Sequence, residues 1–325
     1  MNSLVTGGAG FIGSHLCERL IADGDSVTVI DDLSTGSLTN LSNVKEHDRF
    51  RFFQGSVTEA ELVGRCVADC DRVFHLAAAV GVRLVIQSPL HALLDNTVGA
   101  QTVLAFAAEH GRNIFIASSS EIYGKSEKER FSEEDDRILG PTTISRWGYS
   151  TSKALDELLG FAYFREKGLP VVIGRLFNIC GPRQVGRYGM VVPRFVTAAL
   201  KNEPILVHSD GKQTRSFMDV EDAVEAMVRL MEEPACVGQV FNVGSGEKIT
   251  ILRLAQTVKR LTGSGSPIQF IPYDQAYNEG FEDMRYRVPD ISKLKAAIGF
   301  TPRYGIEEIL SRTIEHLKKE IANER

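Results

Sequence analysis

A tyrosine and a lysine four residues apart are the first residues of this sequence that could do chemistry. In Tyr149-Ser-Thr-Ser-Lys153 the spacing places both side chains on one face of a helix. A tyrosine hydroxyl ordinarily ionises at about pH 10, too high for a general base, but a nearby ammonium lowers its pKa. The pair could therefore take a proton from a substrate hydroxyl, although YxxxK by itself is also common in solvated helices.

A run of serines could complete this reactive group. Ser118-Ser-Ser-Glu-Ile-Tyr-Gly124 follows an expected strand at 113–118. Open α/β sheets bind ligands beyond the carboxyl ends of their strands. A hydroxyl here could hold the substrate oxygen whose proton Tyr149 removes. A serine-rich turn is the alternative interpretation.

A glycine-rich loop near the N-terminus has the pattern of a phosphate-binding turn. Thr6-Gly-Gly-Ala-Gly-Phe-Ile-Gly13 fits both GxGxxG and GxxGxxG, after a strand and before a helix. Glycine lets the backbone come close to a pyrophosphate, and the helix N-terminus offers unpaired N–H groups. Asp31 and Asp32 end the next expected strand, where a carboxylate binds the ribose hydroxyls of NAD and repels the 2′-phosphate of NADP. Together with the serine run and the Tyr149–Lys153 pair, the loop favours a dinucleotide-dependent enzyme.

Strands and helices that could position these residues alternate through the first half of the chain. The expected strands are 3–6, 26–30, 50–54, 72–76, 113–118 and 171–176, and the amphipathic helical stretches are 12–22, 59–67, 89–110 and 149–167. This alternation predicts a Rossmann-type, doubly wound α/β fold, in which helices cover both faces of a parallel sheet.

The second half changes character, with helical segments separated by loops rich in Gly and Pro. The expected helices are 192–201, 220–232, 250–262 and 306–321. We expect a NAD-binding domain at 1–176, joined by about 214–244, and a smaller mixed α/β substrate domain at 177–213 and 245–325, with a cleft between them.

Composition excludes several other classes. The chain has 325 residues, 43% hydrophobic and 24% charged, and a net charge of -5 with no long basic stripe, so we do not expect nucleic acid as a partner. No apolar run approaches the length of a membrane span, and no secretion signal precedes the first strand. Five cysteines without a ligand cluster predict neither a metal site nor a disulfide framework. A cytoplasmic location fits best.

Motifs along nearly the whole chain resemble those of the extended short-chain dehydrogenase/reductase family, in its NAD-dependent nucleotide-sugar epimerase/dehydratase group. The motifs are TGGAGFIG at 6–13, HLAA at 75–78, SSSEIYG at 118–124, YSTSK at 149–153, RLFNICGPR at 175–183, DGKQTRSFMDV at 210–220 and FNVGSG at 241–246. The resemblance is specific for the family and much less so for the substrate.

The resemblance implies roles for individual residues. Tyr149 would take the proton of a sugar hydroxyl, usually at C4, while hydride passes to NAD+, and Lys153 would hold the nicotinamide ribose. Ser119 would be the catalytic hydroxyl, with Ser120 and Glu121 beside it. The implied cofactor contacts are Gly7, Gly10, Phe11, Ile12, Gly13, Asp31, Asp32, Ser56, Val57, Leu76, Ala77, Ala78, Asn96, Tyr149 and Lys153. The implied substrate contacts are Ser119, Ser120, Asn178, Arg183, Val192, Arg215 and Arg287.

Two departures from relatives affect this picture. Where many relatives have an adenine-binding Asp, this chain has Gln54-Gly-Ser-Val57, and Ser56 would be a weaker substitute. The dTDP-glucose 4,6-dehydratases have Asp-Glu where this chain has Ser120-Glu121, so their proton donor for water loss is missing. Ser120 could bind a C6 carboxylate or hydroxyl, and Glu121 could be a base or an acid that anchors a strand end.

The step after C4 oxidation remains open between three chemistries. Ser120-Glu121 resembles UDP-glucuronate decarboxylases, GDP-mannose dehydratases and UDP-glucuronate 4-epimerases alike, and the segment that begins at Arg287 resembles the decarboxylases. The stretch from Phe177 to Arg194, with its run 186–190, resembles bacterial 4-epimerases. We therefore expect a 4-epimerase of a UDP-hexose or UDP-hexuronate first, a UDP-glucuronate decarboxylase second, a 4,6-dehydratase third, and a non-catalytic dinucleotide-binding regulator as a distant alternative.

A homodimer is expected by analogy alone. In relatives the helices that correspond to 89–110 and 149–167 form a four-helix bundle between two subunits. Apolar residues at helical spacing could supply that face here, although they could equally pack on their own sheet: Ala100, Leu104, Ala107, Leu155, Leu158 and Ala162.

Overall fold

A parallel β-sheet forms the centre of the first half of the chain. The structure is a computed structural model that describes residues 1–80, 88–186, 189–272 and 284–323. Within these residues the sheet has seven strands, in the order β11-β6-β5-β4-β1-β2-β3, and each neighbouring pair is parallel. The strands are β1 (Asn2–Thr6), β2 (Ser26–Asp31), β3 (Phe50–Gln54), β4 (Arg72–His75), β5 (Asn113–Ser119), β6 (Val171–Leu176) and β11 (Gln239–Val243).

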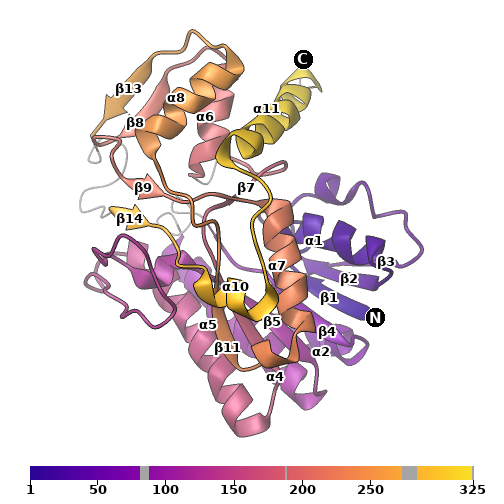
Figure 1. Cartoon of the computed structure of the whole chain (residues 1–325). Coiled ribbons are helices and arrows are strands. Elements are labelled where there is room, and N and C mark those ends of the chain that lie inside the picture. The colour runs from indigo at the N-terminus through magenta and orange to yellow at the C-terminus, as the bar shows by residue number, and fades with distance from the viewer. Residues whose placement is uncertain (81–87, 187–188, 273–283, 324–325) are drawn as a thin grey trace.

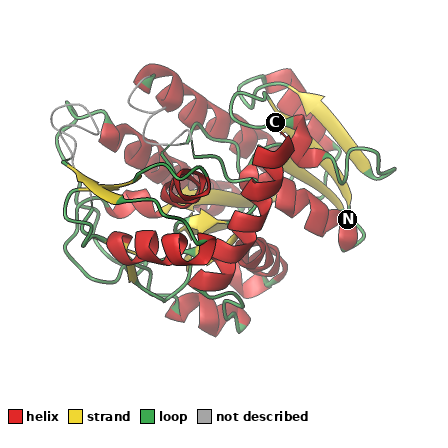
Figure 2. Cartoon of the chain, turned by 90° about the horizontal axis from the view of Figure 1, so that it is seen from above, coloured by secondary structure: helices red, strands yellow, loops and turns green. Residues whose placement is uncertain are grey.

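Helices cover both faces of this sheet because its central strands are apolar on both sides (Figures 1 and 2). On one face α1 (Phe11–Ala22) and α7 (Val220–Glu232) pack against buried residues such as Val5 and Phe115. On the other face lie α2 (Ala60–Ala68), α4 (Pro89–Glu109) and α5 (Arg146–Lys167), against residues such as Leu4 and Ile116. The doubly wound α/β fold expected from the sequence is confirmed.

The second half builds a smaller core of its own. The helices α6 (Val191–Leu200), α8 (Ile251–Thr262) and α11 (Ile306–Asn323) pack around the parallel pair β8 (Ile205–His208) and β13 (Ile268–Ile271). Figure 1 shows this group above the sheet. The short helix α10 (Ser292–Ile298) instead packs on β11 and α7 of the first half. We propose that the division into two domains follows these cores, with α10 belonging to the first.

Very short strands connect the two halves. β7 (Ile179–Cys180) pairs in parallel with β10 (Met218–Asp219). β9 (Thr214–Arg215) lies between β12 (Ile249–Thr250) and β14 (Tyr286–Arg287), antiparallel to the first and parallel to the second. The register pairs Arg215 directly with Arg287, so residues far apart in the sequence lie side by side. The described part of the chain also contains three short 3₁₀ turns: η1 (Leu38–Leu41), η2 (Ser120–Tyr123) and η3 (Pro234–Cys236).

The six strands expected from periodicity are all present, and each bound lies within one residue of its expected position. The seventh strand, β11, was not among them, since Gln239-Val-Phe-Asn-Val243 is too short and mixed a run to identify without its neighbour β6. Of the helices that the structure describes, none is long and apolar enough to cross a membrane.

Candidate functional site

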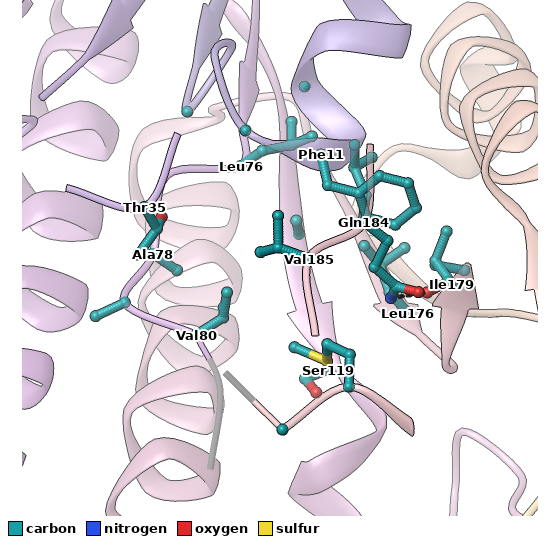
Figure 3. A pocket seen from close by; sticks show the side chains of 18 of the residues that line it. Phe11, Thr35, Leu76, Ala78, Val80, Ser119, Leu176, Ile179, Gln184 and Val185 are labelled. Atoms are coloured by element: carbon teal, nitrogen blue, oxygen red, sulfur yellow. Dashed lines mark hydrogen bonds between the residues drawn. The ribbon is translucent and has the colours of Figure 1, made fainter. Parts of the chain in front are cut away.

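A deep cleft lies at the carboxyl ends of the sheet strands and extends toward the smaller core. It encloses about 750 Å³, a volume suited to a cofactor and a substrate together. Strand order reverses at β1 and β4, which is where open α/β sheets bind ligands. Figure 3 shows Phe11 and Leu76 toward one end of the pocket and Ser119 toward the other, with Val185 between them.

The glycine loop lies between β1 and α1 at the first end of this cleft. Gly7 has φ +72°, and a Cβ there would lie 2.8 Å from the Ala77 nitrogen. A Cβ on Gly13 would lie 2.2 Å from the Gly7 oxygen, so neither position admits a side chain. Gly10 caps α1 without a side-chain bond, and the first turn carries no acidic residue. The amides of Phe11, Ile12 and Gly13 can therefore bind the pyrophosphate of a dinucleotide.

Two aspartates follow β2 and take different roles in the loop. Asp31 accepts hydrogen bonds from the Ala9 amide and the Leu33 amide, both at 2.9 Å, so it fixes the glycine loop against the end of β2. Burial raises its pKa, and those backbone donors oppose the change. Asp32 accepts a bond from the Ser34 amide. Both line the cleft, so both can reach a ribose hydroxyl.

Most of the remaining cofactor candidates line the cleft, and one of them, Asn96, lies behind its wall. Ser56, Val57 and the segment from Leu76 to Ala78 line the cleft. The Ser56 hydroxyl bonds to Thr58, which fixes the turn after β3. Asn96 is 2% exposed and is absent from the lining; it accepts a bond from the Ala79 amide at 2.7 Å. Asn96 thus supports the segment after β4, and its direct contact with the cofactor stays a prediction.

The tyrosine and the lysine occupy the middle of the cleft, on the first turns of α5. The Ser119 hydroxyl, at the end of β5, hydrogen-bonds to Tyr149 and also accepts a bond from the Glu121 amide. Lys153 is 2% exposed. Burial raises the pKa of Tyr149, whereas Lys153 and Ser119 lower it. The effect of burial is larger, so the pKa of Tyr149 lies above its usual value. The lowering by Lys153 expected from the sequence is present, but in the protein alone desolvation outweighs it.

A cluster of charged side chains surrounds the serine run. The Ser120 hydroxyl is wholly buried, outside the lining, and accepts a bond from Arg287 Nε at 2.7 Å. Glu121 accepts from Arg287 through Oε1 at 2.5 Å and from Arg146 through Oε2 at 3.2 Å. Glu121, Arg146 and Arg287 line the cleft close to Tyr149. Two guanidinium groups therefore hold one carboxylate at the reactive end of the cleft, where a substrate carboxylate could compete for them.

The other substrate candidates lie on the wall toward the smaller core. Asn178, with φ +40°, donates to the Ser216 carbonyl at 2.7 Å. Val192 starts the buried face of α6, and Arg215 lies beside Arg287. Arg183 instead donates to Ser14 and Glu18 on α1, so it lies beside the glycine loop. We infer that Arg183 serves the cofactor end of the cleft.

Some cleft residues were missed in the sequence. Arg146 lies one helical turn before Tyr149, and that spacing was a signal that could have found it. Arg194 and His208 also line the cleft, from α6 and β8. Arg187 and Tyr188, part of the run that resembles epimerases, lie outside the described residues. Those residues that the structure does describe contain no cluster of His, Cys, Asp and Glu that could hold a metal ion.

The chain is similar to several known proteins. A family model described as GDP-mannose 4,6 dehydratase matches residues 4–313. The UDP-N-acetyl-alpha-D-glucosaminuronate decarboxylase of Bacillus cytotoxicus is 40% identical over 99% of this chain and 98% of its own length. UDP-glucuronic acid decarboxylase 1 of Xenopus tropicalis is 34% identical over 99% of this chain and 73% of its own.

A solved structure extends the comparison to bound ligands. The UDP-glucuronic acid 4-epimerase of Bacillus cereus, in complex with NAD and UDP-4-deoxy-4-fluoro-glucuronic acid, superposes with a TM-score of 0.88. It is 26% identical and covers 98% of this chain and 100% of its own. The relatives thus include both decarboxylases and epimerases, and the decarboxylases have the higher identity.

Proposed function

This chain belongs to the extended short-chain dehydrogenase/reductase family, in its NAD-dependent nucleotide-sugar epimerase/dehydratase group, and we propose that it decarboxylates a UDP-hexuronate. It is an enzyme of nucleotide-sugar metabolism whose cofactor is NAD. The sequence alone ranked a 4-epimerase first and a decarboxylase second, and we now propose the decarboxylase. The observation that carries the proposal is the pair of arginines on Glu121 beside Tyr149, supported by decarboxylase relatives at 34–40% identity.

The first step would be oxidation at C4 of the sugar. Ser119 would hold the C4 hydroxyl, and Tyr149 would accept its proton, with Lys153 keeping a positive charge close by. NAD, which the loop from Gly7 to Gly13 would hold, would supply reversible hydride transfer at C4 when bound. The proton that Tyr149 accepts would return to the C4 oxygen when the ketone is reduced, and burial, which raises the pKa of Tyr149, favours that return.

The second step would be loss of the C6 carboxylate. Once C4 is a ketone, C6 is the carboxyl of a β-keto acid. The C5–C6 bond breaks, CO2 leaves, and the electron pair becomes an enolate whose oxygen lies at C4, where Ser119 and Tyr149 can hydrogen-bond it. A proton then adds to C5, so the net change is one proton taken up and one CO2 released.

Arg287 and Glu121 would set the strength with which the carboxylate is held. An arginine fork orients a carboxylate in two bonds, but a strong ion pair would also resist the loss of its charge. Glu121 shares Arg287 and Arg146, and so it weakens their hold on a second carboxylate. We propose that this sharing holds the substrate carboxylate in place without binding it too tightly.

The test is product analysis with a panel of UDP-sugars. UDP-N-acetylglucosaminuronate and UDP-glucuronate come first, since relatives act on them by name. We expect CO2 and the corresponding UDP-pentose, with no net consumption of NAD. Tyr149→Phe serves as the inactive control.

A second candidate is a UDP-hexuronate 4-epimerase, favoured by the similarity to the Bacillus cereus enzyme. A C4 epimer of unchanged mass, without CO2, would replace the decarboxylase proposal with this one. The two reactions share the oxidation step and differ in whether the C6 carboxylate is lost or kept.

A further inference from the structure

Asp156 lies on α5 one helical turn after Lys153, fully buried beneath the reactive pair. Its Oδ2 accepts a hydrogen bond from Lys153 Nζ at 3.1 Å. Its side chain is 0% exposed, and its Oδ1 has no hydrogen-bond partner among the described residues. A buried carboxylate with only one partner is costly: burial raises the pKa of Asp156, and Lys153 is the main group that opposes this change.

The neighbouring acid provides a contrast within the same helix turn. Glu157 accepts bonds from Arg175 on both oxygens, at 3.0 and 2.9 Å, and from the Ser118 hydroxyl at 2.5 Å. Its charge is therefore neutralised by a guanidinium. Asp156 has no such arginine within hydrogen-bond distance in the part of the chain that is described, and its charge acts on Lys153.

Asp156 acts on both members of the reactive pair. Burial, the largest influence, lowers the pKa of Lys153, but the attraction of Asp156 and of Tyr149 outweighs it, so that pKa lies above its usual value. On Tyr149 the effect is opposite to that of Lys153, because the Asp156 charge disfavours a phenolate. Asp156 thus keeps Lys153 charged and at the same time cancels part of that charge as Tyr149 experiences it.

We propose that Asp156 is a positioning residue that fixes the Lys153 ammonium and limits how much of its charge acts on the Tyr149 hydroxyl. A limited field suits a tyrosine that must give its proton back within every turnover, since too stable a phenolate would be a poor acid. The inference rests on the proposed roles of Tyr149 and Lys153. It is independent of the step that follows C4 oxidation.

Other charged or titratable groups surround Lys153 and Asp156. They are Tyr149 and Glu157 on α5 itself, Glu121 on η2, His75 on β4 and Arg175 on β6, while α4 presents Asn96 to Ser152. Burial, helped by Lys153, lowers the pKa of His75 to about 3, so it stays neutral through the assay range. Glu157 and Arg175 neutralise each other. Glu121 remains in every variant below, and so it does not contribute to a difference between them.

The experiment is a pH profile of kcat/KM for the NAD-loaded enzyme with Asp156→Asn. Asparagine keeps the shape and the acceptor for Lys153 but removes the charge. Tyr149 and Lys153 titrate as a coupled pair. Without the Asp156 carboxylate the pair loses its first proton more easily, whether that proton comes from Tyr149 or from Lys153. We expect the limb that rises with pH to move to lower pH by about one unit. Glu166→Gln, an exposed acid on the same helix, should leave the limb in place.

Each outcome decides one claim. A profile of Asp156→Asn that coincides with wild type, or that moves to higher pH, overturns the role of Asp156. If Asp156→Asn fails to fold, Asp156→Leu repeats the measurement, since it too removes the charge and fills the buried space. Tyr149→Phe tests the proposed function separately: full activity of that variant would refute proton transfer by Tyr149, whatever Asp156 does.

Discussion

The two ends of the cleft are built in different ways. At the cofactor end, the backbone forms the binding surface. Gly7 and Gly13 pack where no Cβ fits, and Asp31 fixes the loop by accepting hydrogen bonds from two amides. At the reactive end, side chains from separate segments meet as charges: Arg287 from β14, Glu121 from η2 and Arg146 from α5. A cofactor shared by many reactions needs one rigid binding shape, whereas the substrate end can change by single side chains.

The largest expected effect lies at the boundary of the two ends. Tyr149→Phe removes the hydroxyl that would accept the substrate proton, and we expect kcat to fall about 10³-fold. Affinity for NAD, measured by titration calorimetry, should change little because the ring remains. A variant that lost NAD affinity and turnover together would make Tyr149 part of the cofactor end instead.

Next in size is the effect of Arg287, which we propose makes the reactive end selective for a carboxylate. Arg287→Ala removes the fork on Ser120 and Glu121, and we expect KM for a UDP-hexuronate to rise about 100-fold. Arg287→Lys keeps the charge and should recover only part of the loss. The dissociation constant of UDP-glucose, which has no C6 carboxylate, is the control. An equal loss for both ligands would place Arg287 on the diphosphate.

The cofactor end should respond to a single methyl group. Gly13→Ala places a Cβ 2.2 Å from the Gly7 oxygen, and the loop must shift, so we expect NAD affinity to fall by about 10- to 100-fold. Gly265→Ala is the matched control, because no atom lies within 4 Å of its added Cβ. Unchanged NAD affinity in Gly13→Ala, measured by calorimetry, would show that the loop does not hold the pyrophosphate.

A smaller effect is expected on the pH dependence of the free energy of unfolding, through a buried carboxyl in the segment that joins the two halves. Burial raises the pKa of Asp219, at the start of α7, to about 6. In the unfolded chain the value is about 3.9, so the folded protein binds the extra proton between these values and loses stability as pH rises through 6. Asp219→Asn keeps the cap on the Glu221 amide and removes this penalty, worth about 1–3 kcal/mol above pH 7.

Urea unfolding at several pH values measures that difference. The gain of Asp219→Asn over wild type should vanish below pH 4, where the wild-type carboxyl is protonated in both states. A gain that is the same at pH 4 and pH 8 would show that the charge of Asp219 is not the cause.

The smallest effect on turnover is expected at a surface away from both ends. Leu94 on α4 and Leu158 on α5 are 51% and 62% exposed, and the two helices pack together. Of the residues expected on the dimer face, Ala100, Leu104 and Ala107 are buried within their own chain, so that part of the expectation is wrong, whereas Leu155 and Leu158 are exposed. We propose that the exposed face of these helices forms a homodimer. Leu158→Glu should then halve the mass measured by light scattering and leave kcat within about twofold. The exposed Phe270 on β13 gives the control, Phe270→Glu. A monomeric wild type would refute the proposal.

Much of the cofactor end could be predicted from the sequence because its signals are local. The glycine loop, Asp31 and the strands that carry them are adjacent in the chain, and the period of two or 3.6 residues identifies their elements. The pairing of Arg215 with Arg287 could not be predicted, because two-residue strands carry no periodicity. The direction in which the Tyr149 pKa shifts could not be predicted either, because it depends on how deeply the side chain is buried.

The sequence by itself determined the doubly wound sheet, the dinucleotide loop and the Tyr149–Lys153 pair, since each is a short pattern set by backbone geometry. Only the tertiary structure decided that Glu121 is shared by two arginines, that Asn96 supports the cleft wall, and that Asp156 bonds to Lys153. These are matters of distance and desolvation. The energy of a charge depends on what surrounds it in space, which spacing along the chain does not record.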